Sequence, residues 1–163
     1  MTAFWTPILQ SEATSDRAWQ SYPVNEAEWT QVAEALGGET AVLLGLWGDT
    51  DTIRMALLDE ATNQIAVLAL ACPRGSYPSV GQHHAAAQRL ERAARDLFGL
   101  VPRDCADERP WLDHGRWAVR QPLGEATPDA GEGEAYGFLP VEGEGLHQVP
   151  VGPVHAGIIE PGH

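Results

Sequence analysis

The chain has 163 residues and 44% of them are apolar, which suits one globular domain with its own core, or one domain and a tail. A net charge of −13 repels phosphate backbones and argues against a nucleic-acid binder. No apolar run approaches the roughly 18 residues that cross a bilayer, and the N-terminus lacks the basic start of a signal peptide. Two cysteines, Cys72 and Cys105, are too few for a disulfide framework and fit a reducing cytoplasm.

The first predicted helix begins after a segment with little periodicity. Residues 1–24 are expected to form an ordered arm or loop that tucks its aromatic side chains onto the core. Asn25 with Glu28 is close to a capping box, apolar residues then recur at helical spacing, and Gly37-Gly38 ends the helix. The pattern predicts one amphipathic helix of about three turns.

Three strands are predicted next. The continuous apolar run Ala41–Trp47 indicates a strand that is covered on both faces. Thr52–Leu58 alternates between apolar and other residues, and Gln64–Ala71 is a third strand that ends before Pro73. Because the intervening turns are short, these strands should be antiparallel neighbours in a meander over residues 41–72.

A long second helix is predicted from Ser79 to Phe98, with Ser79 and Gln82 as a capping box and Gly99 as its end. Its buried stripe consists of Val80, Ala87, Leu90, Ala94 and Leu97, whereas His83, Gln88, Arg92 and Arg95 lie off that stripe. With this helix packed on the meander, residues 1–122 are expected to form a two-layer α+β domain.

The last 43 residues differ in composition, because they are rich in Gly and Pro. Residues 123–144 are expected to be a flexible acidic linker. Residues 145–163 are apolar and predict an extended tail with a β-hairpin that turns at Gly152-Pro153. A hairpin with no third strand is marginal alone, so it should pack on the domain or on a partner.

Arginine is distributed unevenly, since eight of the ten arginines lie between residues 74 and 120 and the chain has no lysine. Two interpretations remain open. The cluster is either a solvated helix face with its own salt bridges or a docking surface, because Arg forms planar bidentate pairs and is enriched at interfaces.

No complete active site or metal site can be read from the sequence. Three histidines are spaced eight residues apart, but the prolines between them break any straight strand, so no metal is expected (His147, His155 and His163). Cys72 is expected to be a buried strand-end residue. A small enzyme that uses Cys105 or His114 is a minor alternative, and it would need a reactive thiol of low pKa.

The segment Glu91–Leu100, ERAARDLFGL, resembles a helix end in the 30-kDa subunit of respiratory complex I, an NADH dehydrogenase. Asp107 and Arg109 match the loop that follows in that family, whereas Cys105, Ala106 and Pro110 depart from it. The resemblance implies a peripheral-arm subunit that takes part in protein–protein interaction. The interface residues that it implies are Arg92, Arg95, Asp96, Phe98, Asp107, Arg109 and Trp111.

The segment Gly145–His163, GLHQVPVGPVHAGIIEPGH, is similar to the opening of the large subunit of membrane-bound nickel–iron hydrogenases of the formate hydrogenlyase type. The resemblance implies that His155 and Glu160 lie at the edge of a quinone or metal site, catalytic only if a partner chain completes that site. The cysteine motifs that hold nickel or iron–sulfur clusters are absent from this chain. Fe–S clusters and any nickel–iron (NiFe) centre are therefore expected in partner subunits, and no cofactor in this chain.

Together these features predict a non-catalytic docking subunit of an oxidoreductase complex that resembles NADH:quinone oxidoreductase or membrane-bound hydrogenase. Its expected partners are the catalytic subunit (quinone-site or hydrogenase large subunit) and an Fe–S cluster subunit, which carry out electron transport coupled to ion translocation. The expected location is cytoplasmic, peripheral to the inner face of the membrane, with membrane contact only through partners. The alternative is a stand-alone protein-binding or scaffold domain from a truncated gene, without a redox role.

Overall fold

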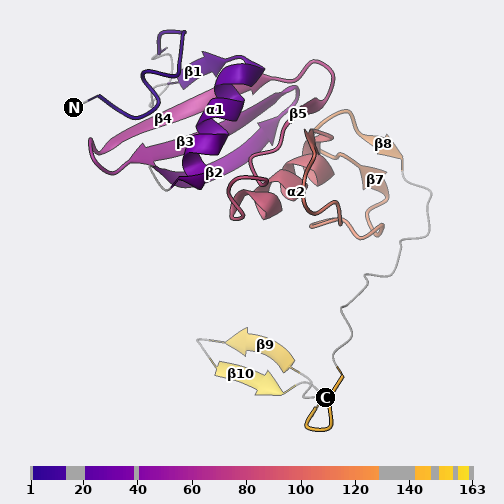
Figure 1. Cartoon of the computed structure of the whole chain (residues 1–163). Coiled ribbons are helices and arrows are strands. Elements are labelled where there is room, and N and C mark those ends of the chain that lie inside the picture. Colours follow the sequence, from indigo (N-terminus) through magenta and orange to yellow (C-terminus); the bar gives the residue numbers. More distant parts are fainter. Residues whose placement is uncertain are drawn as a thin grey trace.

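The computed structural model describes residues 2–13, 21–38, 41–128, 142–147, 151–155 and 158–161, the last two ranges as backbone only (Figure 1). The elements in chain order are β1 (Ser21–Val24), α1 (Glu26–Gly37), β2 (Val42–Asp49), β3 (Thr52–Asp59), β4 (Gln64–Ala71), β5 (Ser76–Pro78), α2 (Ala87–Phe98), β6 (Val101–Arg103), β7 (Val119–Arg120), β8 (Thr127–Pro128), β9 (Val151–His155) and β10 (Ile158–Pro161).

The main sheet has the strand order β1-β4-β3-β2, and β2, β3 and β4 form the predicted antiparallel meander. β1 runs parallel to β4, with Tyr22 opposite Leu68 and Val24 opposite Leu70. The prediction that residues 1–24 contain no strand is therefore wrong for β1. Pro23 interrupts the local strand pattern, but proline is tolerated here because β1 lies at the edge of the sheet.

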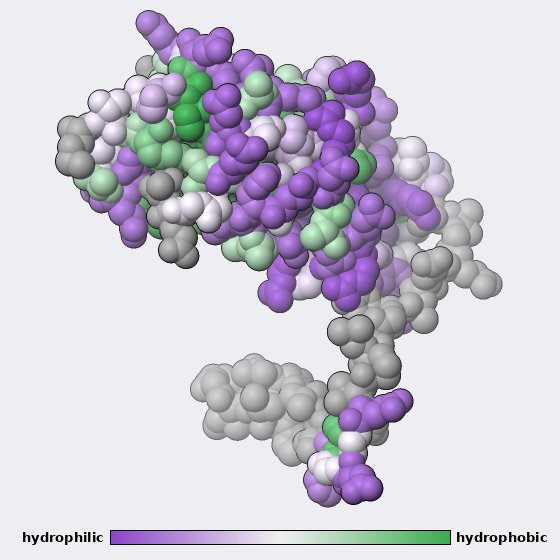
Figure 2. All heavy atoms as spheres, in the orientation of Figure 1, coloured by the Kyte–Doolittle hydropathy of each residue, from purple (hydrophilic) through white to green (hydrophobic). Residues whose placement is uncertain are grey.

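Helix α1 lies across one face of the sheet and forms the second layer (Figure 1). The predicted capping box is present, because the Asn25 side chain accepts from the Glu28 N–H and the Glu28 carboxylate accepts from the Asn25 N–H. The residues of α1 that enter the core are Trp29, Val32, Ala33 and Leu36, and those of β3 are Ile53, Met55 and Leu57. The outer surface on this side is mostly hydrophilic (Figure 2), as expected for a helix that buries only one stripe.

Helix α2 packs on the same side of the sheet as α1. Gly48 of β2 lies opposite the buried Ile53, and a Cβ at Gly48 would come within 2.8 Å of the Phe98 ring. The opposite face of the sheet is not covered by any described helix and exposes Val42 and Trp47. The expectation that Ala41–Trp47 is covered on both faces is therefore wrong, because both helices lie on one side.

The predicted second helix is also shorter than expected at its start, because residues 79–86 are not helical. α2 begins at Ala87, and the preceding residues form turns. Ser79 does not cap a helix, because its hydroxyl donates to Glu91 Oε2 (2.9 Å), twelve residues further along the chain. A tertiary contact thus replaces the local cap that the Ser79–Gln82 spacing predicts.

The N-terminal arm is anchored on the sheet, and Trp5 is buried in the core as expected. The Phe4 N–H donates to the Asp59 carboxylate (2.8 Å), which also accepts from the Ala61 and Thr62 N–H groups. The Phe4 N–H, more than the other donors, lowers the pKa of Asp59. Trp19, also expected on the core, lies outside the described residues.

The C-terminal region contains the predicted hairpin as backbone, since β9 and β10 pair antiparallel. Gly152 and Pro153 lie within β9, so the predicted position of the turn is wrong. In the predicted linker 123–144, β8 pairs with β7, and the Leu123 N–H donates to the Leu97 carbonyl (3.0 Å). Residues 129–141 lie outside the described part. No helix in the described ranges is long and apolar enough to cross a membrane.

We predict that Trp29→Phe lowers the free energy of unfolding by about 1–3 kcal/mol, because it removes the donor of a hydrogen bond that a buried side chain makes. The Trp29 indole N–H donates to the Pro78 carbonyl (3.0 Å), and the side chain is fully buried. Urea unfolding followed by circular dichroism measures the change. Trp47→Phe on the open face is the matched control, and an equal loss in both variants would contradict the assignment.

Candidate docking site

Four charged residues of α2 hold two loops of the chain in place: Glu91, Arg92, Arg95 and Asp96. They all belong to the segment whose sequence resembles the 30-kDa subunit of complex I. Glu91 binds the turn that precedes α2, whereas the other three bind the loop of residues 107–113 that follows β6.

Glu91 is almost fully buried, and its carboxylate accepts three hydrogen bonds. The donors are the Ser79 hydroxyl (2.9 Å) and the N–H groups of Val80 (2.6 Å) and Gly81 (3.2 Å). Burial raises the pKa of Glu91, although these hydrogen bonds oppose that shift. The arrangement satisfies a buried carboxylate with backbone donors and therefore fixes the turn at residues 79–81.

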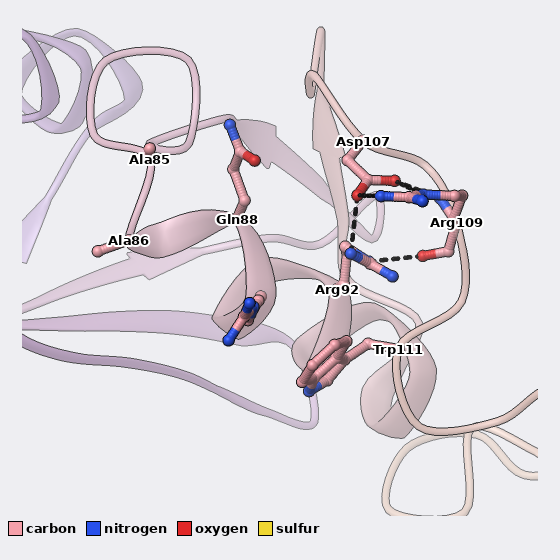
Figure 3. Close-up of a pocket in the computed structure, with 8 residues that line it drawn as sticks. Ala85, Ala86, Gln88, Arg92, Asp107, Arg109 and Trp111 are labelled. Atoms are coloured by element: carbon pink, nitrogen blue, oxygen red, sulfur yellow. Dashed lines mark hydrogen bonds and ion pairs between the residues drawn. The ribbon is translucent and has the colours of Figure 1, made fainter. Parts of the chain in front are cut away.

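Arg92 is only 5% exposed, although the sequence pattern places it off the buried stripe. Its guanidinium donates to the Arg109 carbonyl (2.7 Å), to Asp107 Oδ2 (2.7 Å) and to the Pro110 carbonyl (2.8 Å). Figure 3 shows Asp107 between Arg92 and Arg109. Burial of the cation is possible because one carboxylate and two carbonyl oxygens replace its water.

Asp107 also binds its neighbour Arg109. The Arg109 side chain donates to both carboxylate oxygens (2.9 and 2.7 Å), and its backbone N–H donates to Oδ1 (3.0 Å). These hydrogen bonds from Arg109, together with the positive charges of Arg92 and Arg109, hold the pKa of Asp107 well below its usual range. The carboxylate is therefore ionised under all physiological conditions.

Asp96 fixes the second half of the same loop. Its Oδ2 accepts from the N–H groups of Trp111 (2.7 Å), Leu112 (2.8 Å) and Asp113 (3.4 Å). Arg95 adds a hydrogen bond to the Arg109 carbonyl (2.9 Å). The loop is therefore held on α2 through both a cation and an anion, one turn of the helix apart.

Trp111 forms one wall of a pocket of about 660 Å³ beside this loop (Figure 3). The guanidinium carbons of Arg89 and Arg92 lie 5.1 and 5.2 Å from the centre of its ring, within the range of cation–π attraction. Trp111 and Leu112 are each 39% exposed. The lining residues are Ala85, Ala86, Gln88, Arg89, Arg92, Asp107, Arg109 and Trp111.

Six of the seven predicted interface residues come together here: Arg92, Arg95, Asp96, Asp107, Arg109 and Trp111. Phe98 lies apart, partly buried against β2. The side chains of His155 and Glu160 lie outside the described part of the chain. Sequence reasoning missed Arg89, although its position three residues before Arg92 places both on one side of the helix. An interface role for these residues stays a prediction.

The interpretation of the arginine cluster as a face with its own salt bridges is met in part, because Arg92 and Arg103 form ion pairs within the chain (with Asp107 and Glu26). Arg89 faces the pocket, and the docking interpretation stays a prediction. Cys72 is buried, as expected. Burial raises the pKa of the Cys105 thiol, the opposite of what a reactive thiolate requires. In the described ranges, no three His, Cys, Asp or Glu side chains are grouped to hold a metal ion.

These features define a two-layer α+β domain whose charged second helix carries an anchored arginine–tryptophan loop. The chain belongs to the family described as "Respiratory-chain NADH dehydrogenase, 30 Kd subunit", whose profile matches residues 23–132. The predicted resemblance to the 30-kDa subunit of complex I is thereby confirmed.

The chain is also similar to formate hydrogenlyase subunit 5 of Escherichia coli (strain K12), with 34% identity over 96 residues. The match covers 53% of this chain and only 17% of the relative, so most of that relative has no counterpart here. The predicted relation to formate hydrogenlyase-type proteins is confirmed by this match.

Two solved structures are similar as well. One is a trypsin-resistant fragment of Nqo5 (TM-score 0.47, 14% identity), with 57% of this chain and 85% of the fragment covered. The other is the membrane-bound sulfane sulfur reductase, an archaeal respiratory membrane complex (TM-score 0.48, 17% identity), with 63% of this chain and 68% of the matched chain covered.

Arg92→Lys should lower the free energy of unfolding by about 2–4 kcal/mol, because an ammonium group cannot reach the three oxygens that the guanidinium fork binds. Hydrogen exchange should also become faster at residues 107–113. Arg74→Lys, at an exposed position, is the matched control for the substitution itself. Unchanged exchange in the loop of Arg92→Lys would show that Arg92 does not anchor it.

Asp107 should make stability depend on pH in the acid range. Because its pKa is lower in the folded than in the unfolded chain, its contribution is fully present above about pH 5 and decreases as pH falls through about 4. Asp107→Asn should lack this contribution at every pH. The difference in unfolding free energy between wild type and Asp107→Asn, measured from pH 7 to pH 3, should therefore shrink as pH falls, and a constant difference would contradict the assignment.

Proposed function

We propose that this chain is a non-catalytic docking subunit of an oxidoreductase complex of the NADH:quinone oxidoreductase or membrane-bound nickel–iron hydrogenase kind. The observation that carries the proposal is the anchored loop of residues 107–113. Arg92, Asp96 and Asp107 hold its backbone from inside, while Trp111, Leu112 and the Arg109 side chain remain exposed. Membership of the 30 Kd subunit family supports a role within a larger respiratory assembly.

The loop has the composition of a protein interface. Trp and Arg are the residue types that dominate binding energy at such interfaces. Because hydrogen bonds to α2 already order the loop, binding a partner would not have to order it again, and this lowers the entropic cost of association. A rigid, partly apolar loop with an exposed arginine is suited to contact a neighbouring subunit.

The proposed partners are the catalytic subunit (quinone-site or hydrogenase large subunit) and an Fe–S cluster subunit. They would hold the Fe–S clusters and any NiFe centre and carry out electron transfer coupled to ion translocation, with this chain bound at the cytoplasmic side. The β9–β10 hairpin would join the sheet of the catalytic subunit, since a two-stranded hairpin is marginal by itself. This would bring His155 and Glu160 to the edge of the partner's site.

The test is affinity purification of the tagged full-length chain from membranes of its source organism, followed by mass spectrometry. We expect redox subunits of one complex to co-purify. The double substitution Trp111→Ala and Leu112→Ala should reduce their recovery by about tenfold, in line with the loss of a central aromatic contact. Ile65→Ala, on the opposite face of the sheet, is the matched control.

The purification also separates the proposed role from the alternative. Recovery of the wild-type chain without redox subunits would reject the docking role and favour a stand-alone binding domain. Equal recovery of redox subunits with the double variant would place the contact elsewhere on the chain and reject the loop as the docking element.

A further inference from the structure

The pocket beside Trp111 carries more positive charge than its own carboxylate neutralises. Three arginines and one aspartate line it, which leaves a formal charge of +2 in a chain whose net charge is −13. Both oxygens of Asp107 are already occupied by Arg92 and Arg109. The pocket therefore has cationic hydrogen-bond donors that Asp107 does not neutralise, although the chain as a whole is strongly acidic.

Of the three arginines that line the pocket, Arg89 has no carboxylate partner among the described residues. It is exposed, and no described Asp or Glu lies within ion-pair distance of its guanidinium. The first turn of α2 contains no acidic residue that would offset it. Its position is nonetheless defined, because its guanidinium carbon lies over the Trp111 ring.

Two like charges share the Trp111 ring. Arg89 and Arg92 lie at nearly equal distances from its centre, 5.1 and 5.2 Å, and only Arg92 is paired with a carboxylate. The positive charge of Arg92 is therefore offset by Asp107, whereas that of Arg89 is not offset by a described carboxylate. An anion that enters the pocket beside Arg89 would offset this charge, and the planar guanidinium could donate two hydrogen bonds to it.

The size and walls of the pocket point to an acidic side chain on a protein rather than to a small free anion. About 660 Å³ is far more room than one carboxylate fills, and part of the wall is apolar (Ala85, Ala86 and Trp111). Exposed Leu112 is next to Trp111 in the loop. An Asp or Glu with apolar neighbours would use both the cationic and the apolar parts of this surface.

We propose that this pocket is a receptor for a carboxylate side chain of a partner subunit, with Arg89 as its principal donor and Trp111 as its apolar wall. The inference rests on the proposed docking function and names the chemistry of the contact. Opposite charge would also steer the acidic segment of the partner toward this basic pocket, whereas acidic parts of the surface would repel it.

The absence of lysine from the chain makes a direct test possible. Arg89→Lys places a single side-chain amine at the pocket. A water-soluble carbodiimide activates a carboxylate, the amine in contact with it displaces the activating group, and an amide forms while the carbodiimide leaves as a urea. Mass spectrometry then identifies both joined residues. The full-length tagged Arg89→Lys chain is purified with its complex and treated in this way, and Arg74→Lys, at an exposed position outside the pocket lining, is the matched control.

We expect Lys at position 89, but not at position 74, to be joined to an Asp or Glu of a partner subunit. Arg89→Glu should in addition lower partner recovery by about tenfold, whereas Arg89→Gln should lower it less, because only the former repels a carboxylate. Hydrogen exchange at residues 107–113 should stay as in the wild type, since Arg89 does not bind that backbone.

Co-purification of redox subunits without a link from position 89 to a partner carboxylate would overturn the receptor and leave the docking function standing. A link from position 89 only to an acidic residue of this same chain would also overturn it. Failure of any redox subunit to co-purify with the wild-type chain would instead reject the docking function itself, and the receptor with it.

Discussion

The buried guanidinium of Arg92 is the constraint on which the arrangement of this domain depends. A cation that is only 5% exposed is tolerable only where its donors are satisfied, and Asp107 with two backbone carbonyls supplies that environment. The loop of residues 107–113 is therefore held on α2, because its departure would break the ion pair of Arg92 with Asp107 and two hydrogen bonds to backbone carbonyls. Asp96 also holds the loop, but as an anion: its carboxylate accepts hydrogen bonds from three backbone N–H groups.

The same hydrogen bonds determine which residues of the loop face α2 and which face solvent. Arg92 and Asp96, which the sequence suggests as surface residues, bind the loop backbone from the helix side. Trp111 and Leu112 remain exposed on the outer side of the loop. Arg92 and Arg95 of the arginine-rich segment are thus structural, whereas Arg89 is exposed at the pocket. In a chain of net charge −13, the arginine-rich lining of the pocket has the opposite sign to the whole, which suits the proposed acidic partner.

Local patterns predicted most of the fold, because the forces involved act over short distances. The capping box of α1, the meander of β2, β3 and β4, and the glycine end of α2 are confirmed where periodicity, turns and caps lie within a few residues. The predictions are wrong where a residue far away in the sequence determines the local structure. Residues 21–24 become a strand only beside β4, and Ser79 leaves the helix only because Glu91 binds it.

For the candidate site as well, some features could be predicted from the sequence and others depend on the fold. The family, the residue types of the site and most of its members could be predicted without a structure, since the charged segment Glu91–Leu100 and the pair Asp107 and Arg109 are recognisable in the sequence. Which charges face inward could not be predicted in this way, because their burial depends on residues 107–113 folding back onto α2. The pairing of Arg89 with Trp111, 22 positions apart, follows from that return and from no local pattern.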